Sequence, residues 1–128
     1  RLGAALLQVS QARQPCWKLN LRFGIPDMSR RVQDSARTGW YYRVLEAGDV
    51  APGSVLRLLD RPHPDWPLGR LLLHLYADPL NVSALAAIAA LGNLSASWRE
   101  LAQRRLASGR VEDWSRRLTT PAIQARKQ

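Results

Sequence analysis

The chain has 128 residues, 46% of them hydrophobic, so it is long enough to bury a core and is expected to fold as one domain or two small ones. It has no apolar run near the roughly 20 residues that a membrane-spanning helix needs, and its first ten residues are too short for a secretory signal, so we expect a cytoplasmic protein. The net charge of +9 is an excess of arginine, which keeps anionic ligands and nucleic acid among the candidate partners, although a solvated basic surface also explains it.

Residues 2–60 are predicted to be mostly β structure, because apolar and polar side chains alternate there in short runs. The strand patterns lie at residues 6–9, 40–45 and 55–59. Between the first two, Pro26 suits the first turn of a short helix that runs to Ser35. The sequence therefore predicts a small antiparallel unit with one short helix.

A proline-rich segment at residues 61–67 marks a boundary, because it can continue neither a helix nor a central strand. Beyond it the apolar spacing becomes helical. A first helix carries four leucines on one face and ends before Asp78. A second contains Leu85 and Ile88, with Gly92 as its candidate C-cap.

A third helix is predicted to begin at Ser95 or Ser97, where Ser97 and Glu100 form a capping box, and to end at Gly109. Residues 111–118 add a final helical turn. The sequence therefore indicates an α+β chain with four parts. These are the carboxy-terminal part of a β domain, a proline-rich linker, a three-helix domain and a flexible tail, at residues 1–61, 62–66, 67–118 and 119–128.

Cys16 is the only cysteine, so it is a packed thiol, a nucleophile or a metal ligand rather than half of an internal disulfide. It follows Pro15 and lies three residues after Arg13 and two before Lys18. Nearby cations favour the thiolate, which is the form that attacks electrophiles and binds soft metals. A neutral core thiol beside Trp17 is the alternative, and spacing alone leaves both open.

The two histidines do not extend Cys16 into a known site. His63 lies between prolines and His74 lies among leucines of the first predicted helix. Neither has the spacing of a zinc ligand or the signature of a catalytic partner for a cysteine. We expect His74 to be a packed residue and His63 to be a linker residue.

Two further groups of side chains are candidate ligand contacts. Trp40, Tyr41 and Tyr42 suit either stacking on a planar ligand or filling the β core, and the core is favoured. The third predicted helix and the tail behind it are expected to expose arginines that suit either nucleic-acid phosphates or solvation: Arg99, Arg104, Arg105, Arg110, Arg116 and Arg117.

Residues 7–19 resemble the cysteine motif of MOSC domains, a family named for the carboxy-terminal domain of molybdenum-cofactor sulfurase. Residues 39–45, with Gly48 and the Pro-Gly pair at 52–53, resemble the strands that follow, and residues 60–64 resemble the exit of that domain. Residues 66–118 resemble the small three-helix domain of the branch typified by the 6-N-hydroxylaminopurine resistance protein.

This resemblance implies a β-barrel-like MOSC fold that binds the molybdenum-pterin cofactor, with Cys16 as the catalytic thiolate ligand to the metal. It also makes Arg13 and Lys18 candidates to balance the anionic cofactor. Soft thiolate sulfur suits a metal already bound by dithiolene sulfurs. The branch is associated with reduction of N-hydroxylated bases and related compounds, so N-hydroxylated small molecules and an electron-donating reductase are the implied partners.

MOSC domains have a substantial segment before the cysteine motif, whereas this sequence begins just before it. We therefore expect the chain to be the carboxy-terminal part of a longer protein. We also expect these residues alone not to bind the cofactor, because a truncated barrel leaves strand edges unpaired. Two other functions stay open: nucleic-acid or protein binding through the Arg-rich three-helix domain, and sulfur transfer through a Cys16 persulfide.

Overall fold

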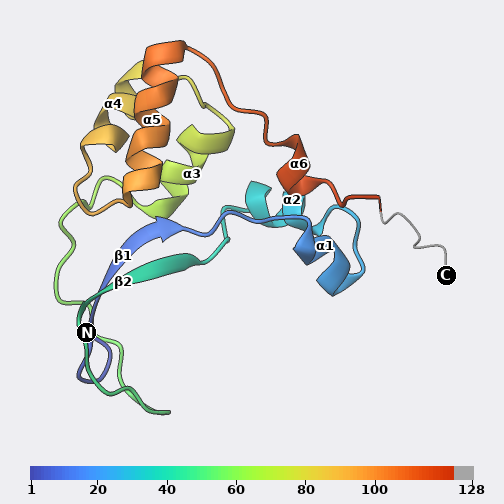
Figure 1. Cartoon of the computed structure of the whole chain (residues 1–128). Coiled ribbons are helices and arrows are strands. Elements are labelled where there is room, and N and C mark those ends of the chain that lie inside the picture. Colours follow the sequence, from blue (N-terminus) through green and yellow to red (C-terminus); the bar gives the residue numbers. More distant parts are fainter. Residues whose placement is uncertain (123–128) are drawn as a thin grey trace. The chain divides into compact units, whose positions relative to one another are not determined.

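The computed structural model describes residues 1–122, which have an α+β architecture, as predicted (Figure 1). The chain divides into two compact units. Unit 1 contains Arg1–Arg13 and Gly39–Val111, and unit 2 contains Gln14–Thr38 and the chain from Glu112 onward. No helix in the described residues combines the length and the apolar character needed to cross a membrane.

Unit 1 contains an antiparallel pair of strands, β1 (Leu6–Ala12) and β2 (Trp40–Glu46). Leu6 lies opposite Glu46 and Ala12 lies opposite Trp40, with shifts in register along the pair. The strands predicted at residues 6–9 and 40–45 are therefore confirmed. β1 continues three residues beyond the predicted strand and ends at Ala12, four residues before Cys16.

The strand predicted at residues 55–59 is wrong. Leu56 forms only an isolated bridge with Leu2, and the N–H of Arg57 donates to the carbonyl of Arg1 at 2.8 Å. Residues 2–5 fold back on themselves, with Leu2 paired to Ala5. This turn offers no extended strand for residues 55–59 to join, so the alternating pattern there does not become a ladder.

The three helices predicted after the proline segment are present in unit 1 as α3 (Leu68–Tyr76), α4 (Val82–Ala90) and α5 (Ala96–Ser108). Figure 1 shows them gathered beside the strand pair. The start of α5 is joined to β1, because the N–H of Ser95 donates to the carbonyl of Ser10 at 2.8 Å. The core between these elements includes the following buried side chains: Ala12, Leu71, Leu72, Leu75, Leu85, Ile88, Trp98 and Leu101.

The predicted helix ends are partly right. Gly109 ends α5 in the left-handed conformation, at φ 62°, as expected for a C-cap glycine. Gly92 is not the C-cap of α4, because the backbone already becomes extended at the buried Leu91. The capping box at Ser97 is also wrong, because α5 takes Ser95 as its N-cap and Ser97 lies inside its first turn.

Arg105 is not part of an exposed basic face, which corrects the prediction for this arginine. It is only 1% exposed, and its Nη1 donates to the carbonyls of Leu75 at 3.0 Å and Pro79 at 3.4 Å. Pro79 has no N–H, so it cannot donate to the carbonyl of Leu75, four residues earlier, as a residue at that position of a helix would. Arg105 supplies a donor there and joins α5 to the end of α3.

Every residue of β2 is exposed, so the favoured core position of its aromatic side chains is wrong within the described residues. Trp40 is 52% exposed, Tyr41 51% and Tyr42 41%. Trp40 and Tyr42 contact each other edge to face, with ring centroids 6.3 Å apart. β2 therefore presents apolar side chains that nothing in unit 1 buries.

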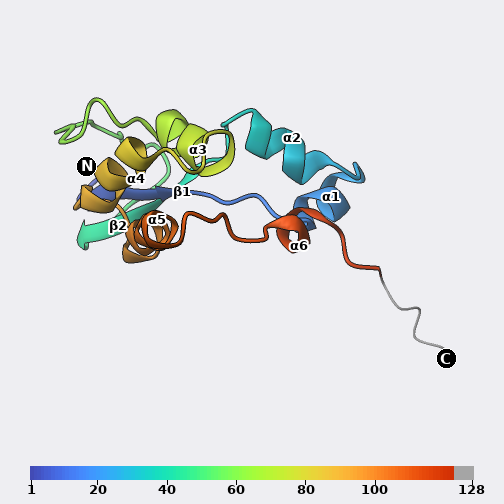
Figure 2. The same ribbon diagram turned by 90° about the horizontal axis from the view of Figure 1, so that it is seen from above.

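Unit 2 contains α1 (Lys18–Phe23), α2 (Met28–Asp34) and α6 (Ser115–Leu118). The predicted short helix is confirmed as α2 and the final helical turn as α6. α1 was not predicted, because six residues are too few to show a helical period. Figure 2 shows α6 beside α1, although nearly a hundred residues separate them in the sequence.

Candidate functional site

Cys16 lies in unit 2, between the end of β1 and the start of α1. It is a free, half-buried cysteine, and the preceding Pro15 is fully buried. The carbonyl of Cys16 accepts a hydrogen bond from the N–H of Leu19 at 3.0 Å, at the start of α1. Cys16 is therefore only partly buried, and its backbone is hydrogen-bonded to the start of α1.

Arg117 of α6 contacts both peptide groups that flank Cys16. Its carbonyl accepts from the N–H of Trp17 at 2.7 Å, and its Nη1 donates to the carbonyl of Pro15. Its Nη2 donates to Oε1 of Gln33 on α2. Residues 15–17, the cysteine segment, are thus hydrogen-bonded on both sides of Cys16 by Arg117.

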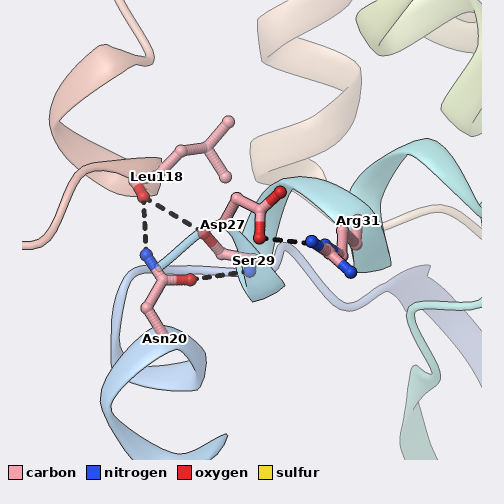
Figure 3. A network of polar contacts seen from close by, with 5 residues as sticks. All are labelled: Asn20, Asp27, Ser29, Arg31 and Leu118. Carbon is pink, nitrogen blue, oxygen red and sulfur yellow. Dashed lines mark hydrogen bonds and ion pairs between the residues drawn. The ribbon is translucent and has the colours of Figure 1, made fainter. Parts of the chain in front are cut away.

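A buried polar network joins the three helices of unit 2 (Figure 3). Asn20 of α1 is 4% exposed, and its Oδ1 accepts from the N–H of Ser29 on α2 at 2.7 Å. Its Nδ2 donates to the carbonyl of Leu118 at 3.1 Å and to Oγ1 of Thr120 at 3.2 Å. Ser29 Oγ donates to the same Leu118 carbonyl at 3.1 Å, so α6 is held against both α1 and α2.

The cations proposed to balance the cofactor lie in different units. Lys18 is exposed at the first position of α1 and shares unit 2 with Cys16. Arg13 is exposed at the end of the first stretch of unit 1, where its N–H donates to the carbonyl of Gly39 at 2.9 Å. Within unit 2, Lys18 lies two residues after Cys16 in the chain, and Arg117 hydrogen-bonds the peptide groups on either side of Cys16.

His74 is a packed histidine, as predicted. Its side chain is 11% exposed, its Nδ1 lies 3.4 Å from Asp78 Oδ2, and its ring centroid lies 5.9 Å from that of Trp66. Among residues 1–122, no group of three or more His, Cys, Asp or Glu side chains is arranged to hold a metal ion.

Two carboxylates stand at the starts of short helices in unit 2. Asp27 precedes α2 and pairs with Nε of Arg31 at 2.9 Å (Figure 3), and this hydrogen bond lowers the pKa of Asp27 below its usual 3.8. Asp113 precedes α6, and hydrogen bonding from Ser115 lowers its pKa in the same direction. Both groups are therefore ionised at neutral pH.

Sequence reasoning missed Asn20 and Arg117 as parts of this site. The sequence only groups Arg117 with other arginines expected on the surface, and Asn20 lies in a helix that the sequence did not predict. The contacts of both residues bridge about a hundred positions of sequence. No local motif marks such pairs, because they form only when distant segments pack together.

Two family models match the chain. Residues 1–57 match the MOSC domain, and residues 66–109 match the YiiM-like, 3-alpha helix domain. The two matched segments correspond to the strand-containing first part of the chain and to the α3–α5 helices.

The chain is 36% identical to protein YiiM of Escherichia coli over 118 residues, which is 92% of this chain and 52% of YiiM. The crystal structure of E. coli YiiM matches with a TM-score of 0.81 at 34% identity, covering 94% of this chain and 59% of that one. Protein YflK of Bacillus subtilis is 43% identical over 99 residues, or 77% of this chain and 45% of YflK. The chain thus spans about half the length of these curated relatives.

A protein of Gibberella moniliformis named "Reductase" is 38% identical over 81 residues, which cover 63% of this chain and 14% of that protein.

Proposed function

Residues 1–57 belong to the MOSC domain family and residues 66–109 to the YiiM-like three-helix family, and from this premise we propose that the chain is part of a molybdenum-cofactor-dependent oxidoreductase. In this proposal the Cys16 thiolate is the catalytic ligand to the metal, and Arg13 and Lys18 balance the anionic cofactor. The substrates are N-hydroxylated bases or related compounds, and a partner reductase delivers electrons. The similarity to a protein named "Reductase" supports the redox class.

The position of Cys16 is the observation that carries this proposal. The thiol is free and partly accessible, and the peptide groups before and after it are both hydrogen-bonded. A metal ligand needs this combination, because the sulfur must reach the metal while its backbone stays fixed. A thiol that served only to fill a core would instead be expected to be fully buried.

The donor set fits a molybdenum-pterin cofactor. A single thiolate would add one ligand to a metal that the pterin already binds through sulfur, and exposed cations attract anionic groups. When bound, the cofactor supplies the redox-active metal for the reduction. In this proposal Cys16 would hold that metal, and Arg13 and Lys18 would be the cations that balance its anionic groups.

Cofactor binding in this proposal requires more protein than these residues supply. The chain spans 52% of YiiM, and the aromatic side chains of β2 are exposed. We propose that further YiiM-like sequence, in the same chain or another, covers β2 and completes the pocket. Burying the apolar side chains of β2 would stabilise this association by roughly 25 cal/mol per Å² of apolar surface.

Metal and pterin analysis tests the proposal. The chain and a version extended at its amino terminus with YiiM-like sequence are each produced in a host that makes molybdenum cofactor. The expected result is near-stoichiometric molybdenum in the extended protein and its loss in Cys16→Ala, with the helical circular dichroism unchanged. Molybdenum retained by Cys16→Ala would overturn the ligand assignment. Its absence from the extended protein would overturn the cofactor assignment.

The structure provides no specific support for nucleic-acid binding through α5. Arg105 is buried, Arg99 is half-buried and Arg104 is exposed, and their spacing places them at different angles around the helix. An electrostatic interface needs cations on a shared exposed face.

A sulfur-carrier role for Cys16 predicts that a reductant releases sulfide from the original chain but not from Cys16→Ser.

A further inference from the structure

The two peptide groups on either side of Cys16 are bound by the same residue. The N–H of Trp17 donates to the carbonyl of Arg117 at 2.7 Å, and the guanidinium of Arg117 donates to the carbonyl of Pro15. All of these residues belong to unit 2. A rotation of the backbone that changed the direction of the Cys16 side chain would have to break at least one of these bonds.

We propose that Arg117 is a positioning residue for Cys16. This inference rests on the proposed function, in which the Cys16 thiolate binds the metal. Arg117 acts through the backbone of the cysteine segment, so that the sulfur is presented in one direction before any cofactor arrives. The segment that follows α5 is thereby a working part of the cysteine site.

The Arg117 side chain is itself held in place. Its Nη2 donates to Oε1 of Gln33 on α2, and its guanidinium carbon lies 4.7 Å from the centroid of the Trp114 ring. A planar, forked guanidinium satisfies two acceptors and stacks on an aromatic ring at the same time, which the single ammonium of lysine cannot do. Arginine is therefore specifically suited to this position.

The polar network beside it supports the same arrangement. The carbonyl of Leu118, the next residue, accepts hydrogen bonds from both Asn20 and Ser29, at 3.1 Å each (Figure 3). Asn20 and Ser29 are both buried, so these bonds are shielded from competing water. Arg117 thus projects from a backbone that is anchored one residue further on.

Arg117 is therefore expected to raise the affinity of Cys16 for the metal without touching the metal itself. Removing a residue that orients a metal ligand typically costs about 10- to 100-fold in affinity. We expect a loss in that range for Arg117→Gln. The same substitution should loosen the cysteine segment in the chain without cofactor, so the inference is testable apart from metal binding.

The first test uses the 128-residue chain without cofactor. We measure amide hydrogen exchange at Trp17 and the rate at which iodoacetamide alkylates Cys16. Arg117→Gln is expected to raise both rates about tenfold, because it removes charge-assisted hydrogen bonds that keep the segment closed. Arg116→Gln is the matched control, since it removes the same charge from an exposed position of α6 and should change neither rate.

Two further observations separate positioning from general destabilisation. Arg117→Lys keeps one cationic donor for the Pro15 carbonyl, so it should restore both rates to within about threefold of the original chain. Amide exchange in α5 of unit 1 should stay unchanged in every variant. Alkylation in Arg117→Gln at the original rate would overturn the inference, as would equally faster exchange throughout α5.

If Arg117→Gln fails to fold, Gln33→Ala is the second variant. It removes one anchor of the guanidinium and should raise the Cys16 alkylation rate roughly threefold. An unchanged rate in that variant would overturn the inference. Failure of the proposed function would look different: the alkylation results would stand, but the extended protein would hold no molybdenum.

Discussion

Asn20→Asp is the sharpest test of the network that holds α6 against the cysteine-bearing part of unit 2. The substitution keeps the shape of the side chain and keeps an oxygen for the N–H of Ser29. It replaces the amide donor by an oxygen that faces the carbonyl of Leu118, 3.1 Å from the present Nδ2. Two acceptors then face each other in a site where Asn20 is only 4% exposed.

The cost follows from the bonds that are lost. Donation to the Leu118 carbonyl and to the Thr120 hydroxyl disappears, at about 1 kcal/mol each. Ser29 still donates to the Leu118 carbonyl, but a carboxylate oxygen placed against that carbonyl in a buried site adds up to about 2 kcal/mol. We expect the free energy of opening α6 to fall by about 2–4 kcal/mol. Since 1.4 kcal/mol is a factor of ten, the exchange rate of the Trp17 amide should rise at least about 30-fold at neutral pH.

The pH dependence gives this prediction a sign. Burial beside a carbonyl raises the pKa of the introduced carboxyl in the folded state, so its proton is held more tightly there than in the unfolded chain. The penalty is therefore full at neutral pH and disappears toward about pH 4, where the protonated carboxyl can donate to Leu118. Asn93→Asp, at a half-exposed position in unit 1, is the control. Trp17 exchange within twofold of the original chain would refute the reasoning.

Two further predictions concern stability. Arg105→Met should lower the free energy of unfolding by about 2 kcal/mol in urea denaturation, because it leaves the Leu75 carbonyl without its donor, whereas Arg104→Met should change it by less than about 0.5 kcal/mol. Equal stability of the two variants would show that burying the guanidinium offsets its hydrogen bonds. The stability that Asp27 gains from Arg31 is present above the unfolded pKa near 3.8 and is lost as pH falls through the lower folded pKa. The difference in melting temperature between the original chain and Asp27→Asn should therefore shrink below about pH 4, and a constant difference would contradict it.

The exposed β2 strand shows why the aromatic prediction failed. Period-two alternation in residues 40–45 correctly predicted a strand, but it does not say what lies over either face. The side chains of Trp40, Tyr41 and Tyr42 are exposed because no described element covers them. The strand predicted at residues 55–59 failed for a related reason, since a ladder needs an extended partner.

The sequence by itself determined most of the local elements and the family. Leucine spacing predicted the three helices of unit 1, Gly109 ended the last of them, and the motif around Cys16 identified the MOSC family that the comparisons confirmed. These features are readable because each depends on residues close together in the chain.

Only the tertiary structure decided which polar side chains hydrogen-bond to the cysteine segment and which hydrogen-bond to helix ends. Among arginines that look alike in the sequence, Arg105 is buried against helix-end carbonyls, Arg117 brackets Cys16, and Arg116 is exposed. Asn20, in a helix too short to show a period, became the centre of the network that holds α6. The physical reason is that a hydrogen bond across about a hundred residues depends on how distant segments pack, and no local pattern encodes it.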